Sequence, residues 1–244
     1  MPRKVVAVVQ ARMSSSRLPG KVMMRLADRP IVDWIFRAAL CSAEIDDLVL
    51  ATSQDPSDDI LVDYAKTRGI SVIRGSLNDV LDRFLLAAEH TKADAIVRLT
   101  ADCPMLDPAL IDAVVSMWRH NDHTDYVATT LYRTLPRGLD VECVKVSALL
   151  ELREKATGYH RTHVTSMLYA AGSEFSRLGL VTSPDRSQLR LTVDTPQDLE
   201  ALSEITSLTG DRVVGWMEIL NILGDNPRIA AINKDIRQKD VSEG

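Results

Sequence analysis

The sequence predicts an α/β fold built on a doubly wound, mostly parallel sheet. The run VVAVV at residues 5–9 has no polar interruption, which is typical of a strand buried on both faces of a parallel sheet. Apolar strands then alternate with amphipathic helical stretches along the first half of the chain. The 244 residues are 45% hydrophobic and 26% charged, an ordinary globular composition with enough chain to bury a large core. We therefore expect helices on both faces of the sheet, in three Rossmann-like layers.

Regular alternation of strand and helix covers residues 5–130. Asp107 followed by Pro108 is typical of a helix N-cap and a first-turn proline, which marks the start of the last helix in this half. The strands expected here lie at 5–10, 48–51, 71–73, 95–99 and 126–130. The helices expected here lie at 31–42, 58–68, 79–90 and 108–120.

The second half is less regular. Residues 139–146 alternate between apolar and polar side chains, which predicts a half-exposed strand. Thr195-Pro196 is typical of a helix start. The other elements expected are helices at 147–155, 161–170 and 214–223, a short strand at 190–193, and a polar tail that frays.

A basic, hydroxyl-rich loop, QARMSSSRLPGK at residues 10–21, directly follows the first strand. It leaves the carboxyl end of that strand, where open α/β sheets bind ligands. Hydroxyls and N–H groups of residues 14–16, the planar guanidinium groups of Arg12 and Arg17, and the mobile charge of Lys21 suit a triphosphate. The loop is not a Walker motif, because Gly20-Lys21 is followed by valine. A solvated surface turn is the alternative interpretation.

Two carboxylates, Asp102 and Asp194, each follow a predicted apolar strand and lie near a proline that redirects the chain. Hard oxygen ligands together with phosphate oxygens describe a Mg²⁺ site, in which Mn²⁺ could substitute. Spacing alone equally allows Asp102 to cap a turn and Asp194 to cap the helix at Pro196. Asp194 could serve both purposes, because a cap uses one carboxylate oxygen.

Composition excludes several classes of protein. The net charge of −5 argues against a general nucleic-acid surface. No apolar run has the length of a membrane span, and MPRK leads directly into a strand, so we expect a cytoplasmic protein that binds no membrane. Cys41, Cys103 and Cys143 have no metal-site spacing, which predicts reduced thiols.

Five blocks of sequence resemble the sugar cytidylyltransferases, in particular the SpsF-type branch of spore-coat polysaccharide synthesis, which is similar to the CMP-ulosonic acid and CMP-acylneuraminate synthetases. They cover roughly residues 4–205 in order, so chance resemblance is a poor explanation. The blocks are QAR at 10–12 with SRLPGK at 16–21, LATS at 50–53, RGS at 74–76 with DVLDR at 79–83, RLTADCP at 98–104, and LTVDTP at 191–196.

The resemblance implies a nucleotidyltransferase-like fold and a Mg²⁺-dependent cytidylyltransferase. Such an enzyme moves CMP from CTP to an anionic acceptor, such as a sugar acid, sugar phosphate or phosphonate, and releases pyrophosphate during polysaccharide or surface-glycan precursor synthesis. The positions that match Asp102 and Asp194 hold the metal in those families. We expect in-line attack without a covalent enzyme intermediate, with Arg17 and Lys21 neutralising the β- and γ-phosphates. The catalytic residues expected are therefore Arg17, Lys21, Asp102 and Asp194.

In the resembled enzymes the first loop and the ends of the following strands recognise the nucleotide. A pocket that selects cytosine accepts a hydrogen bond from N4 and donates to N3 and O2. Ser53 could instead belong to a turn, and for Asp79 we favour a helix cap. The nucleotide-binding residues expected are Gln10, Ala11, Arg12, Met13, Ser14, Ser15, Ser16, Arg17, Lys21, Thr52, Ser53, Asn78, Asp79, Thr100 and Ala101.

The acceptor side resembles the family in two blocks. PRGLDVE at 136–142 resembles a block ending in GLDVE, and RTHVT at 161–165 resembles REHVT with Thr162 in place of glutamate. Ala101 also stands where many relatives have glycine. Alternatives are that His160 and His163 lie on an exposed helical face and that Arg98 forms an internal ion pair. The acceptor-binding residues expected are Arg74, Arg83, Arg98, Arg137, Asp140, Glu142, His160, Arg161 and His163.

No repeat or flexible linker divides the chain, so we expect one domain over 1–244. The resemblance divides it into four parts. Residues 1–131 form a nucleotide-binding half, and 132–180 form an acceptor, lid or dimerisation insertion. Residues 181–210 carry the second carboxylate and a closing helix, and 211–244 form a C-terminal helix and tail. Relatives are commonly dimers, which implies a homodimer. Trp34, Trp118 and Trp216 could supply its interface or could lie in the core.

Other functions stay open at this point. Uridylyl- and guanylyltransferases share the layout, and nucleotide selectivity would distinguish them. A nucleotide-sugar glycosyltransferase usually carries Asp-x-Asp after the relevant strand, where this chain has Asp102-Cys103-Pro104. A non-catalytic binding protein would not need Arg17, Lys21 and both carboxylates.

Overall fold

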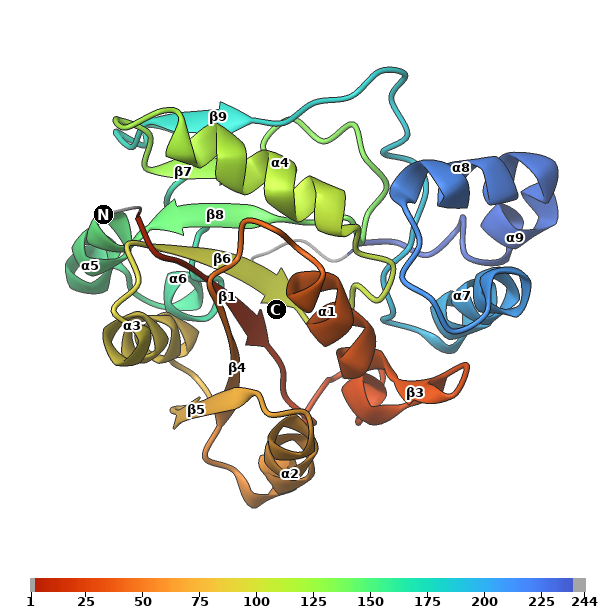
Figure 1. Cartoon of the computed structure of the whole chain (residues 1–244), viewed down its shortest axis with the longest axis horizontal. Coiled ribbons are helices and arrows are strands. Elements are labelled where there is room, and N and C mark those ends of the chain that lie inside the picture. The colour runs from red at the N-terminus through yellow and green to blue at the C-terminus, as the bar shows by residue number, and fades with distance from the viewer. Residues whose placement is uncertain (1–2, 239–244) are drawn as a thin grey trace.

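A seven-stranded sheet forms the centre of the computed structural model, which describes residues 3–238 (Figure 1). Its strand order is β5-β4-β1-β6-β8-β7-β9. Only β8 runs antiparallel to its neighbours, so the predicted mostly parallel sheet is confirmed. The strands are β1 Val5–Gln10, β4 Asp47–Ser53, β5 Ser71–Gly75, β6 Ala95–Thr100, β7 Tyr126–Ala128, β8 Glu142–Lys145 and β9 Arg177–Gly179. A separate ribbon pairs β2 Arg25–Leu26 with β3 Arg29–Pro30.

Helices cover both faces of the sheet, because alternate side chains of each buried strand point to opposite sides. Residues 5, 7 and 9 of β1 pack with α1, α2, α4 and α7, while residues 6 and 8 pack with α3 and α5. The helices are α1 Ile31–Leu40, α2 Asp59–Thr67, α3 Val80–Thr91, α4 Pro108–Arg119, α5 Val146–Lys155, α6 Tyr159–Thr162, α7 Pro196–Thr209, α8 Trp216–Asp225 and α9 Pro227–Ile232. Two 3₁₀ turns are η1 Lys21–Met23 and η2 Pro56–Asp58. This arrangement confirms the three layers (Figure 1).

The elements of the first half match their prediction to within about three residues at each end, and two caps are confirmed. Asp107 accepts a hydrogen bond from the N–H of Ala109 at 2.8 Å and starts α4. Thr195 forms a capping box with Asp198 at the start of α7. Trp34 and Trp118 are 2% and 1% exposed, so these two belong to the core.

Four predictions for the second half are wrong. Strand β8 is buried on both faces, because Cys143 packs in the apolar cluster that contains α4 and Val144 packs in the cluster that contains α5. The helix expected at 161–170 ends at Thr162, because Val164 has a positive φ of 27° and hydroxyls beyond it bond to other side chains. Residues 190–193 form no strand, only a bridge between Arg190 and Arg137. The predicted polar tail contains α9, too short for a periodic signal; residues 239–244 lie outside the described part.

The 132–180 segment lies in the same sheet, because it supplies β8 and β9. All three cysteines are free thiols, as predicted. Within residues 3–238, no helix combines the length and the apolar character that crossing a membrane requires.

Candidate active site

A cleft of about 960 Å³ opens where β1 and β6 end, because the carboxyl ends of parallel strands meet at one edge of the sheet. Seventeen of the residues proposed from the sequence line it. They are Gln10, Ala11, Arg12, Ser15, Ser16, Arg17, Lys21, Arg83, Arg98, Thr100, Ala101, Asp102, Arg137, Asp140, Glu142, His163 and Asp194. The basic loop and both carboxylates thus face one space.

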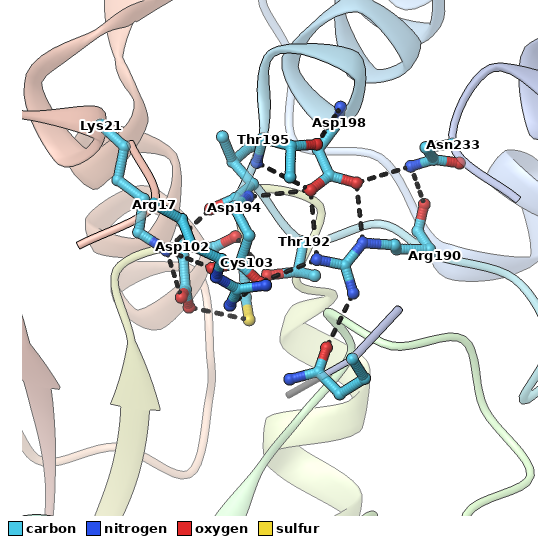
Figure 2. A network of polar contacts seen from close by, with 12 residues as sticks. Arg17, Lys21, Asp102, Cys103, Arg190, Thr192, Asp194, Thr195, Asp198 and Asn233 are labelled. Atoms are coloured by element: carbon cyan, nitrogen blue, oxygen red, sulfur yellow. Dashed lines mark hydrogen bonds and ion pairs between the residues drawn. The ribbon is translucent and has the colours of Figure 1, made fainter. Parts of the chain in front are cut away.

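Lys21 joins the two carboxylates (Figure 2). Its Nζ donates to Asp102 Oδ2 at 2.8 Å, to Asp194 Oδ1 at 2.7 Å and to the carbonyl oxygen of Val193 at 2.8 Å. Burial lowers the pKa of Lys21, but the two carboxylates raise it by more, so it lies above its ordinary value. Burial raises the pKa of Asp102, and the Lys21 charge outweighs this and lowers it to about 2. Both groups are therefore charged at neutral pH.

Asp194 is also held from its other side. Its Oδ2 lies 2.8 Å from an Arg17 nitrogen and 2.8 Å from Arg190 Nη2. Thr195, not Asp194, caps α7, so the helix-cap interpretation of Asp194 is wrong. Because Arg17 pairs with Asp194, its guanidinium bridges the basic loop to the chain before α7.

A buried network continues behind Asp194 (Figure 2). Arg190 donates from Nε to Asp198 Oδ1 at 2.7 Å and from Nη1 to Gln238 Oε1 at 2.7 Å. Asp198, which is 0% exposed, also accepts from the N–H groups of Asp194 and Thr195. Asn233 Nδ2 donates to Asp198 and to the Arg190 carbonyl. The sequence interpretation missed this network, whose only signal was Asp198 three residues after Thr195.

Gly138 allows the segment that carries Asp194 to pack closely against the backbone at residue 138. Its φ is +98°, and a Cβ there would lie 2.5 Å from the backbone carbon of Leu191. Beside it, the N–H of Leu191 donates to the Arg137 carbonyl at 2.6 Å, and the N–H of Arg137 donates to the Leu189 carbonyl at 3.0 Å. Only glycine permits this conformation and this approach.

The two carboxylates fit a divalent cation in their chemistry. Asp102 Oδ2 and Asp194 Oδ1 converge within 2.8 Å of one positive atom, the Lys21 ammonium. Mg²⁺ commonly takes one or two protein carboxylates and completes its shell with water and phosphate oxygens. Within residues 3–238, no three His, Cys, Asp or Glu side chains cluster into a site made of protein ligands alone.

Thr52 and Ser53 do not line the cleft, because they form hydrogen bonds with Asp58, which also binds the basic loop. Both are 0% exposed, and both hydroxyls donate to Asp58 Oδ2. Asp58 Oδ1 in turn accepts from the N–H of Met13 at 2.7 Å. These residues therefore support the loop. Met13 and Ser14 also lie outside the cleft lining.

Asn78 and Asp79 lie at the start of α3, outside the cleft lining. Asp79 caps α3 by accepting from the N–H of Asp82 at 3.0 Å, the role favoured from the sequence. Its carboxylate also pairs with Arg161 at 2.9 Å, which keeps Arg161 out of the cleft. The Asn78 carbonyl accepts from the Thr162 hydroxyl.

Two other residues proposed for the acceptor lie outside the cleft lining, because other groups bind them. Arg74 donates to the carbonyls of Ser53 and Asp55 and pairs with Asp59 at 2.6 Å. His160 Nδ1 lies 2.7 Å from the Ser166 hydroxyl.

Two ion pairs lie in the cleft lining. Arg98 pairs with Glu142, so the internal pair considered for Arg98 is present although Arg98 also lines the cleft. Glu142 accepts from the hydroxyls of Tyr126, at 2.6 Å, and Thr165. Burial raises the pKa of Glu142, but Arg98 and the hydroxyls lower it by more, to below its ordinary value.

The second pair joins Arg133 and Asp140 through two hydrogen bonds of 2.6 and 2.8 Å. Such a bidentate pair fixes the plane of the guanidinium. The sequence interpretation included Asp140 and missed Arg133.

Arg83 and His163 are cleft residues with few polar partners. Arg83 is 1% exposed, its Nε has no partner among the described residues, and burial together with the Arg12 charge lowers its pKa to about 10. His163 Nε2 is likewise buried without a described partner, and burial, Arg98 and Arg12 lower its pKa. His163 therefore faces inward and is uncharged at neutral pH, so the exposed-face interpretation is wrong for it.

Cleft residues that the sequence interpretation missed come mostly from irregular segments, where no periodic pattern points to a face. They are Val22, Cys103, Thr130, Leu131, Tyr132, Arg133, Gly138, Thr162, Tyr169, Arg177, Thr192, Arg237 and Gln238.

Comparison with known proteins assigns a family to this fold and cleft. Residues 6–232 match the family model described as Cytidylyltransferase. The spore coat polysaccharide biosynthesis protein SpsF of Bacillus subtilis is 33% identical over 93% of this chain and 96% of its own length. A 3-deoxy-manno-octulosonate cytidylyltransferase of Leptospira interrogans is 28% identical over 74% of this chain and 72% of that protein.

A solved structure agrees over the whole fold. The structure of a cytidylyltransferase from Leptospira borgpetersenii superposes with a TM-score of 0.91 at 30% identity and covers 98% of this chain and 100% of that one. The nucleotidyltransferase-like fold expected from the sequence is therefore confirmed. With its family match across almost the entire length, the chain belongs to the cytidylyltransferase family.

Proposed function

We propose that this cytidylyltransferase moves CMP from CTP to an anionic acceptor and releases pyrophosphate, with Mg²⁺ as cofactor and Mn²⁺ as a substitute. The observation that carries the proposal is the single cleft in which the basic loop after β1 meets Asp102 and Asp194. Family membership favours CTP over UTP and GTP as the donor.

The acceptor we propose is a sugar acid used for a surface-glycan precursor. SpsF is named for spore coat polysaccharide biosynthesis, and the second relative is named for an octulosonate, which is a sugar acid. The charge of the cleft supports an anion, because Arg12 and Arg137 line it and neither forms an ion pair with a described carboxylate. A carboxylate would bind such guanidinium groups in a planar, bidentate fashion.

The proposed mechanism is mostly positioning and charge neutralisation. An acceptor oxygen held beside Arg137 attacks the α-phosphate in line, and no covalent enzyme intermediate forms. Arg17 and Lys21 hold the β- and γ-phosphates and stabilise the charge on departing pyrophosphate. Asp102 and Asp194 would hold the divalent cation, which when bound supplies Lewis-acid polarisation of the α-phosphate.

The test is pyrophosphate release from CTP, UTP, GTP and ATP with Mg²⁺, against a panel of ulosonic acids, sugar phosphates and phosphonates. We expect release only with CTP and an ulosonic acid. Asp102→Asn should abolish it while Asp63→Asn, on an exposed carboxylate, should not. Release with UTP or GTP in place of CTP would contradict the donor, and release that survives Asp102→Asn would contradict the mechanism.

A further inference from the structure

The place between Asp102 and Asp194 where the proposed cation would bind holds the Lys21 ammonium (Figure 2). An ammonium has three N–H donors, and these meet three acceptors at 2.7 to 2.8 Å, two carboxylates and the Val193 carbonyl. Lys21 is only 7% exposed. A divalent cation that bridges the two carboxylates through these oxygens would therefore compete with Lys21 for Asp102 Oδ2 and Asp194 Oδ1.

The charges around the Lys21 ammonium are already balanced. Asp102, Asp194 and Asp198 face three cationic side chains, Lys21, Arg17 and Arg190. A divalent cation added beside a resident ammonium would meet strong like-charge repulsion in a poorly solvated place. A cation that bridges Asp102 and Asp194 at this position therefore requires Lys21 to leave.

A bound triphosphate would offer the Lys21 ammonium other partners. Lys21 is the last residue of the basic loop and begins η1, directly after Gly20, whose φ of 73° is left-handed. The Lys21 side chain has four rotatable bonds. Ser15 and Ser16 of the same loop line the same cleft. The phosphates of a nucleotide on this loop would lie within reach of Lys21 and would replace the carboxylates as its partners.

We propose that Lys21 occupies the cation site of the unliganded protein and exchanges with the divalent cation when CTP binds. The inference rests on the proposed function and adds an order of binding to it. The cation binds well only after the triphosphate has replaced the carboxylates as the partner of Lys21. Coupling between two ligands is reciprocal, so the cation raises the affinity for CTP by the same factor.

The experiment uses Mn²⁺ as the probe and follows the electron paramagnetic resonance signal of free Mn²⁺, with no acceptor present so that CTP is not consumed. Without nucleotide, Lys21→Met should bind one Mn²⁺ at least about 10-fold more tightly than the unchanged protein, within the usual range for coupled sites. Lys155→Met is the matched control, because Lys155 forms an exposed pair with Glu151. The gain should disappear in Lys21→Met combined with Asp194→Asn.

A second measurement needs no variant. CTP should raise the Mn²⁺ affinity of the unchanged protein at least about 10-fold, after correction for Mn²⁺ bound to free CTP, and Mn²⁺ alone should leave its Tm unchanged. If the unchanged protein binds Mn²⁺ equally well with and without CTP, the exchange is wrong while the proposed function stands. If CTP turnover proceeds fully in a chelator, the cation role in the proposed function fails instead.

Discussion

Glu142 shows how neighbouring side chains stabilise a buried charge in the cleft. Glu142 has 8% of its side chain exposed, and its two oxygens are shared among Arg98, Tyr126 and Thr165. A buried carboxylate with this many donors is costly to protonate. The sequence could identify Asp102 and Asp194 because each lies within a family block. It could not place Arg133 or Arg190, whose roles depend on partners that folding brings together.

Replacement of Glu142 by glutamine should destabilise the protein by about 3 kcal/mol at pH 7, because Arg98 would keep a buried charge without its carboxylate. The pKa of Glu142 is lowered from its ordinary 4.5, so its contribution is complete above pH 4.5 and is lost as the pH falls through the lowered value. Urea unfolding from pH 7 to pH 3 should therefore show the difference between the two proteins narrowing below pH 4.5. Exposed Glu151→Gln is the control, and a difference that stays constant with pH would contradict the assignment.

At the scale of elements, regular strands and helices were predictable and the pieces between them were not. The buried run of β1 and the caps of α4 and α7 are local signals, which sequence alone displays. The burial of β8 depends on α4 and α5, which pack on its two faces, so its own alternating pattern was misleading. Side-chain support of loops is equally nonlocal, as Asp58 beneath the basic loop shows.

Asp58→Asn should loosen the basic loop. The carboxylate accepts from the N–H of Met13 and Ser53 and from two hydroxyls, whereas asparagine has one acceptor oxygen and turns an NH₂ group toward donors. We expect a loss of about 2 kcal/mol in unfolding free energy and a higher KM for CTP with a smaller change in kcat. Asp59→Asn, next to it but exposed, is the control. An unchanged KM would show that Asp58 does not position the loop.

Gly138→Ala should disturb the contact between the Arg137 segment and the chain before α7. The added Cβ would combine a positive φ with a 2.5 Å approach to Leu191, which should cost about 3 kcal/mol or more in unfolding free energy. Gly69→Ala is a close control, because Gly69 has a φ of +69° and no atom within 4 Å of a Cβ. Equal losses in both variants would mean that backbone strain, and not the close approach, explains the effect.

Over the whole molecule, the site depends on chain segments far apart in sequence. The loop after β1, the end of β6, the chain before α7 and the segment at 233–238 all contribute residues to one cleft or to the network that supports it. The sequence predicted the first three, because family blocks mark them, and missed the fourth, which carries no such block. The homodimer implied by the resemblance stays a prediction that light scattering on the purified protein can check.

Shortening the chain tests whether the C-terminal segment positions Asp194. A chain that ends at Ile232 loses Asn233 and Gln238, so Asp198 and Arg190 each lose an amide partner and Arg190 holds Asp194 less firmly. We expect kcat to fall about 10-fold or more, since small displacements of a catalytic group are costly, while KM for CTP changes less. A chain that ends at Gln238 keeps both amides and should retain full activity. If both chains lose stability but keep the same kcat, the segment only stabilises the fold; if kcat falls only in the shorter chain, it orients the carboxylate on which the proposed chemistry depends.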